Sequence, residues 1–396
     1  VVFYINSDET LMKKYVILPE SKIAMYGLNL LPYVDYYLDN KPNNKILIKN
    51  PDFSLFNRSK VSNKVLHNIV IRSLKNKKIP YTESTFLWVF LMALAKLGVI
   101  KIRGKNDAKN DEDLYENNNS LLTVMPQYLT RSKAFHTNEP FCVMSDKEQK
   151  RGKEILLSKG IDIEESHVTA HARDDEFHNT KKAQWDHRNT EFKSILQALS
   201  YLSEKNIYSY RMGAVQKKYT KDDLRLPHKV IDYTSLFRSE FMDIYLISNA
   251  KFHIEDTSGL MGVPYLFNVP QVNINYIPIF NCQCRKDDLW IPKKLWLIKE
   301  KRFMKFSEIL SMDHALFINS SFYKDSGIEV VDNSEHEILS VVKEMNDKID
   351  GKIIYSEEDE EVQVEFKNLF DKNDVTSSAT ARLGRSFLYE NLELLR

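Results

Sequence analysis

From about residue 167 onward, strand-like apolar segments alternate with helix-like amphipathic ones, and this alternation constrains the fold more than any other feature of the sequence. Strands are predicted at 167–171, 207–211, 251–255, 265–269 and 328–331, and helices at 191–205, 240–248 and from about 334 to 345. Strands that alternate with helices at this spacing predict an α/β fold with a parallel, doubly wound sheet.

Three of these predicted strands end in polar clusters, which are His171-Ala-Arg-Asp174, Arg211-Met-Gly213 and Asp256-Thr-Ser-Gly259. In open α/β sheets, ligands bind outside the carboxyl ends of the strands. We therefore expect the three clusters to face one crevice that takes a small ligand.

Composition excludes several classes of protein. The chain has 396 residues, of which 43% are apolar and 28% charged, as expected for two globular domains with real cores. Its 56 basic and 55 acidic residues create no bulk field toward nucleic acid or anionic lipid, so no nucleic-acid partner is expected. The longest apolar run covers only residues 86–95, whereas a bilayer crossing needs about 20. Three cysteines without zinc-site spacing favour a reduced, cytoplasmic setting.

The predicted organisation has three parts. Residues 1–155 form an N-terminal α/β domain interrupted by an exposed polar loop at 105–119, and residues 156–350 form the C-terminal domain. Residues 351–396 are expected to be helices that pack back on the domains. In the N-terminal part, strands are predicted at 14–18, 22–25, 45–49, 121–125 and 141–144, and helices at 61–75, 84–97 and from Ser145 to about Leu157. Ser145 and Glu148 form the pattern of a capping box for the last of these helices.

The first polar cluster combines a proton carrier with a phosphate-binding group. Side chains alternate along a strand, so His171 and Arg173 project to the same side. A guanidinium group suits phosphate oxygens, and an imidazole or an adjacent carboxylate such as Asp174 can take a proton. The structural alternative is a salt bridge from Arg173 to Asp174 or Asp175.

The other clusters also have two interpretations. The turn formed by Thr257, Ser258 and Gly259 would present backbone amides and a hydroxyl to a diphosphate, or would simply cap a short helix. Arg211, followed by Gly213, could reach a phosphate or pair with Asp232.

Arg188 and Asn189 precede a predicted helix and could contact a sugar or fix the loop. No two histidines have metal-ligand spacing beside a carboxylate, so neither a metal nor another cofactor is expected.

Taken in order, these motifs resemble a bacterial family of glycosyltransferases from surface-polysaccharide gene clusters. The matching segments are 171–174, 188–189, 210–213, 231–233, 241–246 and 257–260, followed by Pro270, Asn275 and the terminal Phe387-Leu388. The chain departs from the family at Ala24-Met25, where Gly-His is usual, and in the insert 105–119.

The resemblance implies a GT-B fold, with two Rossmann-like doubly wound domains facing across a cleft and a nucleotide-sugar held mainly by the C-terminal one. The His-x-Arg segment is also similar to that of GT-B fucosyltransferases, in which the arginine holds the donor diphosphate. The resemblance at 231–233 further marks Asp232 and Tyr233 as candidate contacts for the sugar or nucleotide, and Asp256, which begins the cluster 256–259 at a strand end, is another candidate.

The resulting hypothesis is metal-independent transfer of a sugar from a nucleotide-sugar to a hydroxyl of a glycan, polysaccharide or lipid-linked glycan. Arg173, Arg211 and the amides of residues 257–259 would neutralise the departing diphosphate, and His171 or Asp174 would take the acceptor proton. The expected location is the cytoplasm, with peripheral association at the inner face of the membrane compatible with it.

Two alternatives stay open: a GT-B nucleotide-sugar epimerase, and a catalytically silent glycan- or nucleotide-binding module of a larger protein, which the start at Val1 would suit.

Overall fold

In the computed structural model, the chain divides into two compact units. Unit 1 comprises residues 1–143 with 265–267, and unit 2 comprises 144–264 with 268–396. The structure describes residues 15–17, 30–31, 34, 45–48, 63–97, 101–103, 120–122, 139–162, 164–174, 183–213, 225–282, 284–312, 317, 320–371 and 375–396.

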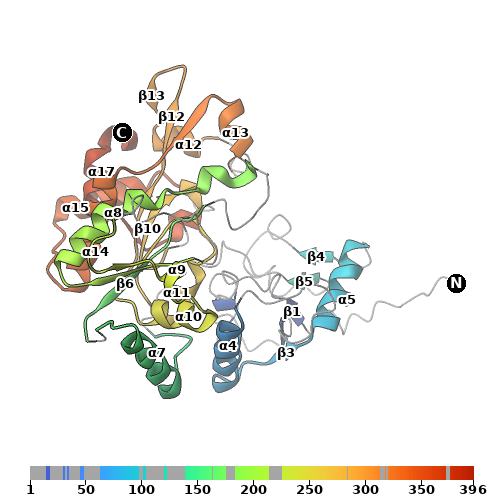
Figure 1. The fold of residues 1–396 in the computed structure, drawn as a ribbon. Coiled ribbons are helices and arrows are strands. Elements are labelled where there is room, and N and C mark those ends of the chain that lie inside the picture. The colour runs from blue at the N-terminus through green and yellow to red at the C-terminus, as the bar shows by residue number, and fades with distance from the viewer. Residues whose placement is uncertain are drawn as a thin grey trace. The chain divides into compact units, whose positions relative to one another are not determined.

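Unit 2 is built on a seven-stranded sheet in which each neighbouring pair of strands is parallel (Figure 1). The strand order is β15-β11-β10-β9-β6-β7-β8. The bounds are β6 His167–Ala170, β7 Tyr208–Arg211, β8 Val230–Ile231, β9 His253–Glu255, β10 Gln271–Tyr276, β11 Leu289–Pro292 and β15 Arg382–Leu383. From the centre of the sheet, the chain runs outward through β6, β7 and β8 on one side and through β9, β10 and β11 on the other. The sheet is therefore doubly wound, as the alternating pattern predicts.

The helices of unit 2 begin where short polar side chains cap them. Ser145 and Glu148 form the predicted capping box at α7, and Ser334 and Glu337 form another at α14. Helices α8 and α14 lie side by side (Figure 1), and α7 packs on α10. The helix bounds are α7 Asp146–Ser158, α8 Leu196–Glu204, α9 Tyr233–Leu236, α10 Glu240–Ser248, α11 Gly262–Phe267, α12 Phe306–Leu310, α13 Ser320–Asp325, α14 Glu335–Ile349, α15 Glu357–Lys367, α16 Val375–Ser378, α17 Arg385–Glu390 and α18 Leu392–Leu395. The last three residues of α11, 265–267, are assigned to unit 1. The described part of unit 2 also contains three 3₁₀ helices, η6 Ala183–Arg188, η7 Phe192–Ile195 and η8 Ile279–Asn281.

The division between the units falls before α7, whereas the predicted boundary at 155/156 falls within that helix. The structure places all of α7 in unit 2 because its Gly152 packs directly beneath the ring of Tyr245 on α10. Residues 351–396 also belong to unit 2, where β15 forms a sheet edge and α17 contacts α14.

Three predicted strands differ in the structure. Residues 265–269 are not a strand: they lie largely in helix α11, which ends at Asn268 in the left-handed conformation with φ 56°. The prediction was wrong because a short run of apolar residues shows no periodicity, and periodicity is what would distinguish a buried strand from a buried helix. Residues 141–144 form no regular element. The strand at 328–331 exists, as β14, but it joins a separate antiparallel sheet with β12 Lys294–Leu297 and β13 Arg302–Phe303.

Unit 1 contains a five-stranded parallel sheet of order β3-β2-β1-β5-β4. The bounds are β1 Tyr15–Ile17, β2 Lys45–Ile48, β3 Tyr81–Glu83, β4 Lys101–Arg103 and β5 Ser120–Leu122, with helices α4 Lys64–Asn76 and α5 Thr85–Lys96. The predicted strand at 22–25 and the polar loop at 105–119 lie outside the described residues. Two parallel sheets with helices between their strands confirm the α/β class with two Rossmann-like domains. In the part of the chain that is described, every helix is too short or too polar to traverse a bilayer.

Candidate active site

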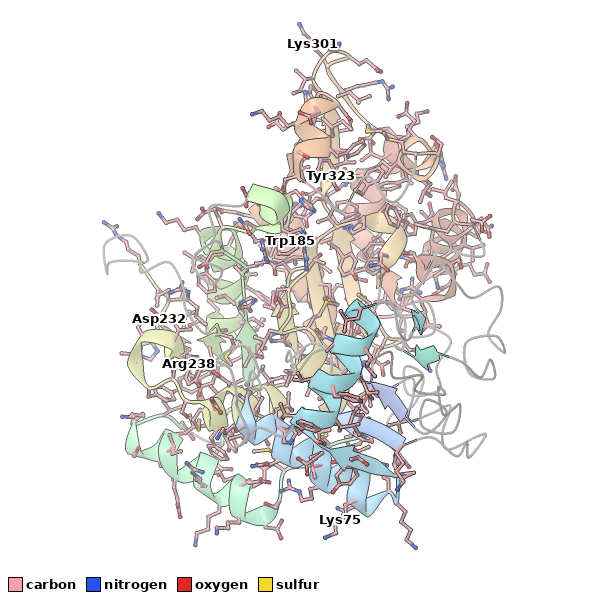
Figure 2. The ribbon with its side chains drawn as sticks, turned by 90° about the vertical axis from the view of Figure 1, so that its right-hand side faces the viewer. Lys75, Trp185, Asp232, Arg238, Lys301 and Tyr323 are labelled. Carbon is pink, nitrogen blue, oxygen red and sulfur yellow. The ribbon has the colours of Figure 1, made fainter. Side chains whose placement is uncertain are left out.

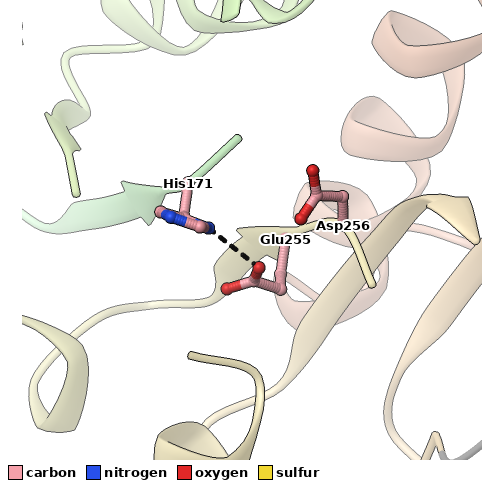
Figure 3. Close-up of side chains that lie close together, drawn as sticks. All are labelled: His171, Glu255 and Asp256. Atoms are coloured by element: carbon pink, nitrogen blue, oxygen red, sulfur yellow. Dashed lines mark hydrogen bonds and ion pairs between the residues drawn. The ribbon is translucent and has the colours of Figure 1, made fainter. Parts of the chain in front are cut away.

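The candidate site of unit 2 lies at the carboxyl ends of β6 and β9. Strand register pairs Thr169 with His253 and Ala170 with Ile254, so His171 comes beside Glu255. Because side chains alternate, Thr169, His171, His253 and Glu255 all lie on one face of the sheet. Figure 3 shows His171 and Glu255 in contact, with Asp256 next to them.

The carboxylate of Glu255 is the centre of a buried hydrogen-bond network. It is 0% exposed, and its Oε1 accepts from His171 Nδ1 at 3.0 Å and from Ser258 Oγ at 2.5 Å. Its Oε2 accepts from His253 Nε2 at 2.8 Å, and His253 Nδ1 in turn accepts from Thr169 Oγ1 at 2.7 Å. An ionised carboxylate can only accept, so the donor roles of both imidazoles toward Glu255 follow from its chemistry.

Charge interactions in this network favour an ion pair. Burial by itself would lower the pKa of His171, but the charge and hydrogen bond of Glu255, with smaller contributions from Asp256 and Asp174, raise it to about 8. Burial would raise the pKa of Glu255, but His171 and His253 lower it to about 2. At neutral pH the pair is therefore imidazolium and carboxylate. Burial and the charge of Glu255 raise the pKa of the neighbouring Asp256 to about 7.

Two guanidinium groups lie beside this pair. Arg173 NH1 donates to the carbonyl of Trp185 at 3.1 Å and to the side chain of Asn189. Arg188 donates to the carbonyl of Thr257, at 3.0 Å from Nε and 2.5 Å from NH2. All three acceptors are neutral.

Within the described residues, no ion pair joins Arg173 to Asp174, and Asp175 lies outside them. The structural alternative for Arg173 was a salt bridge at the strand end, and the described contacts of Arg173 do not include such a bridge to Asp174.

The positive groups are close enough to affect one another. Burial lowers the pKa of Arg188, and the charge of Arg173 lowers it further. The pKa of His187 falls to about 4, because of burial and then because of Arg188, Lys293 and Arg173. These shifts show a concentration of positive charge at this edge of the sheet.

The loop that carries Arg188 is held to the strand ends by several bonds. Thr190 N donates to the carbonyl of Arg173 at 3.0 Å, and Asn275 Nδ2 donates to Thr190 Oγ1 at 3.2 Å. Lys293 Nζ donates to the carbonyl of Asn189 at 2.7 Å. Asp256 Oδ2 accepts from the backbone N–H of Arg173 at 2.8 Å. The predicted residues His171, Arg173, Arg188, Asn189 and Asp256 are thus brought together, with Thr257 and Ser258.

Arg211, Asp232 and Tyr233 belong to a different cluster. Strand register pairs Arg211 with Ala170, which puts its side chain on the opposite face of the sheet from His171. Its guanidinium lies 3.4 Å from Asp232 and 5.0 Å from the ring centroid of Phe192. Tyr233 is fully buried and donates to Asp243 at 2.9 Å.

Figure 2 shows Asp232 beside Arg238 and well apart from Trp185. Trp185, whose carbonyl accepts a hydrogen bond from Arg173, lies near Tyr323. Arg211 thus pairs with Asp232, which was the structural alternative for this residue.

The turn at 257–259 also differs from its expected form. Helix α11 begins at Gly262, so these residues form a bend before the helix and not its first turn. The hydroxyl of Ser258 donates to Glu255, and Thr257 Oγ1 accepts from the N–H of Ile277 at 3.0 Å. Gly259 is exposed, and Gly213 follows β7 with φ 139°.

Sequence reasoning missed Glu255, His253 and Lys293. The segment His253-Ile-Glu255 contained the signal, since alternation places its two polar residues on one face of a strand. Lys293 directly follows β11, so it also stands at a strand end.

His171, Glu255 and Asp256 each offer a ligand atom, and these atoms lie within 4.8 Å of one another. Both oxygens of Glu255 already accept hydrogen bonds from protonated donors, which a metal ion would have to displace. The absence of a metal requirement remains a prediction.

No protein-family model matches the chain, and no curated protein matches it. A glycosyl transferase family 9 structure from Veillonella parvula is similar, with TM-score 0.40, 11% identity and coverage of 71% of this chain and 86% of that one. UDP-GlcNAc 2-epimerase from Neisseria meningitidis follows with TM-score 0.27, 15% identity and coverage of 66% and 81%. A variant of the wall teichoic acid polymerase TagF has TM-score 0.25, 11% identity and coverage of 87% and 90%. These TM-scores all lie below 0.5, so the chemistry of the site is derived from its own side chains.

Proposed function

We propose that this chain is a glycosyltransferase that moves a sugar from a nucleotide-sugar to a hydroxyl of a glycan acceptor. The observation that carries the proposal is the pair Arg173 and Arg188 beside the imidazolium of His171. The hydrogen bonds of these two guanidinium groups to described residues all go to neutral acceptors. Such a concentration of positive charge with planar donors fits a diphosphate.

The reaction explains why these groups would be needed. When the bond between the anomeric carbon and the phosphate oxygen breaks, negative charge builds on the departing diphosphate. Fixed cationic donors aimed at that charge stabilise the transition state without reorganising. Asn189 and Thr257 accept hydrogen bonds from the two guanidinium groups and hold them in place, and the backbone N–H of Arg173 donates to Asp256, which fixes the main chain there.

The acceptor hydroxyl must lose a proton to a base. Asp174, which is half-buried and directly follows Arg173, is the candidate from unit 2. The resemblance of segments 171–174, 188–189 and 257–260 to bacterial polysaccharide glycosyltransferases supports a cell-surface glycan or lipid-linked glycan as acceptor. It also supports a cytoplasmic site of action, at the inner face of the membrane.

The first experiment is a binding screen with nucleoside diphosphates, measured as thermal shift and then by calorimetry, since a ligand specific for the folded state stabilises it. Arg173→Ala and Arg188→Ala should each weaken binding by about 10-fold to 150-fold, the value of a charge-assisted hydrogen bond of about 1.5–3 kcal/mol. The matched control is Arg302→Ala, because Arg302 is a surface arginine bonded to Glu300 and Glu308 on the small antiparallel sheet.

The second experiment incubates the best-binding nucleotide-sugar with and without glycan acceptors and analyses the products. Sugar transfer supports the proposal. A changed nucleotide-sugar formed without acceptor would identify an epimerase, and binding without turnover would identify a silent module. If no nucleoside diphosphate binds, or if both arginine variants bind as tightly as the wild type, the proposal fails.

A further inference from the structure

We propose that Glu255 is a positioning residue that fixes His171 as an imidazolium with its Nε2–H presented to the departing diphosphate. His171 is then a cationic donor to the leaving group and not the base for the acceptor. This inference rests on the proposed function and assigns the role of its central residue.

The orientation of the imidazole follows from its contacts. Nδ1 lies 3.0 Å from Glu255 Oε1 (Figure 3). It also lies 3.3 Å from Ser258 Oγ, so this ring nitrogen is directed to the protein interior. The other nitrogen, Nε2, makes no hydrogen bond with the described residues. The side chain of His171 is 11% exposed and that of Glu255 is 0% exposed, so the ring joins the buried carboxylate to the accessible edge of the sheet.

The carboxylate is itself locked in place. His253 holds its second oxygen at 2.8 Å, and the Thr169 hydroxyl fixes the tautomer of His253 by donating to its Nδ1. With Ser258 as a further donor, Glu255 is stabilised as an anion. A fully buried anion is costly unless a cation compensates it, and His171 is in direct contact to do so.

The charges around His171 come from three segments. Strand β9 and the residue after it contribute the carboxyl groups of Glu255 and Asp256 and the titratable but uncharged His253, the loop of His171 contributes Asp174 and Arg173, and η6 contributes Arg188. The nearest is Glu255, and the balance raises the pKa of His171 to about 8. At pH 7 the ring is therefore mostly charged, which suits an anion and does not suit a base.

The transfer step balances with His171 in this role. The bond from the anomeric carbon to the phosphate oxygen breaks, and its electron pair goes to that oxygen. A lone pair of the acceptor oxygen forms the new bond to the anomeric carbon, and the acceptor proton passes to a separate base, for which Asp174 is the candidate. His171 keeps its proton and donates a hydrogen bond to the oxygen that gains charge.

The test follows the titration of His171 by NMR in protein labelled at histidine, with the signal assigned by its loss in His171→Gln. In the wild type His171 should titrate near pH 8, and in Glu255→Gln its pKa should fall below its ordinary 6.5, because burial then acts without the carboxylate. Glu255→Asp, which keeps the charge, should restore a raised pKa. The matched control is Glu390→Gln, which removes the carboxylate 3.7 Å from the surface histidine His336 and should leave His171 unchanged.

The functional readout is the affinity for a nucleoside diphosphate against pH. Wild-type affinity should fall about tenfold or more between pH 7 and 9, as one charged donor is lost, and in Glu255→Gln this fall should move to lower pH. Turnover that instead rises as His171 loses its proton would show a base and overturn the inference, as would a wild-type titration at or below pH 6.5. If no nucleoside diphosphate binds, the proposed function fails, whereas the titration still decides whether Glu255 controls the charge of His171.

Discussion

The stability of unit 2 should decrease in mildly alkaline solution because of one residue, His171. Its pKa is about 8 in the folded chain and 6.5 when unperturbed, a difference that corresponds to about 2 kcal/mol. Because the folded value is the higher one, this stabilisation is complete below pH 6.5 and is lost as the pH rises through 8. Between pH 7 and 9 the loss should be about 1 kcal/mol.

This pH window separates His171 from its titrating neighbours. Asp256 has a pKa raised to about 7 by burial and by Glu255, so its effect on stability falls mainly below pH 7. Burial raises the pKa of the Cys142 thiol to about 12 from an ordinary 9, so its effect begins above pH 9.

The assay is urea unfolding followed by tryptophan fluorescence in a Trp88→Phe background. The remaining indoles, Trp185, Trp290 and Trp296, all belong to unit 2 and report on it alone. His171→Gln should remove most of the decrease in the free energy of unfolding between pH 7 and 9. A wild-type protein equally stable at both pH values, or a variant that keeps the full decrease, would refute the assignment of the ion pair.

Three further predictions concern packing, the second arginine cluster and metals. Gly152→Ala should cost about 1–3 kcal/mol in thermal unfolding, because the added methyl would lie 2.1 Å from the ring of Tyr245, and a Tyr245→Ala background should remove most of that cost. Arg211→Met should destabilise unit 2 by about 1–3 kcal/mol through the loss of its contact with Asp232, yet leave nucleoside diphosphate affinity unchanged in calorimetry; weaker binding would return Arg211 to the site. Initial rates should be the same with and without EDTA, since both oxygens of Glu255 are already hydrogen-bonded, and a loss that Mg²⁺ restores would contradict this.

The strands and helices with a clear period could be predicted from the sequence. Segments 167–171, 207–211 and 251–255 contain β6, β7 and β9, and the box of Ser145 and Glu148 fixed the start of α7. In these elements local periodicity and capping chemistry agree with the final fold, so neighbouring residues carry enough information.

Other features depended on contacts between distant parts of the chain. Strand β10 was not predicted, although Gln271, Asn273 and Asn275 alternate with apolar residues as in a half-buried strand, and the structure buries all six of its residues. Its polar atoms find partners far away in sequence, such as the bonds that Asn275 exchanges with Asn333. No local sequence pattern predicts such pairing between distant residues.

The same reasoning explains which site residues the sequence identified. Arg173 follows a predicted strand and Arg188 precedes a predicted helix, and both were recognised by these positions. Whether Arg211 shares a face with His171 depends instead on strand register. A shift of one residue along β7 would have turned Arg211 toward the face of His171.

The buried ion pair and the half-buried guanidinium groups of Arg173 and Arg188 act together electrostatically. Glu255 balances His171 inside the sheet, and the hydrogen bonds of the Arg173 and Arg188 guanidinium groups to described residues go to neutral carbonyl and amide oxygens, so their positive charge stays available at the edge. Like charges held this close raise the free energy of the ligand-free state, and a bound diphosphate would remove that repulsion. Under the proposed function, binding of the donor and stabilisation of its leaving group would have one physical cause, because the field that attracts the diphosphate becomes more favourable as the diphosphate gains charge.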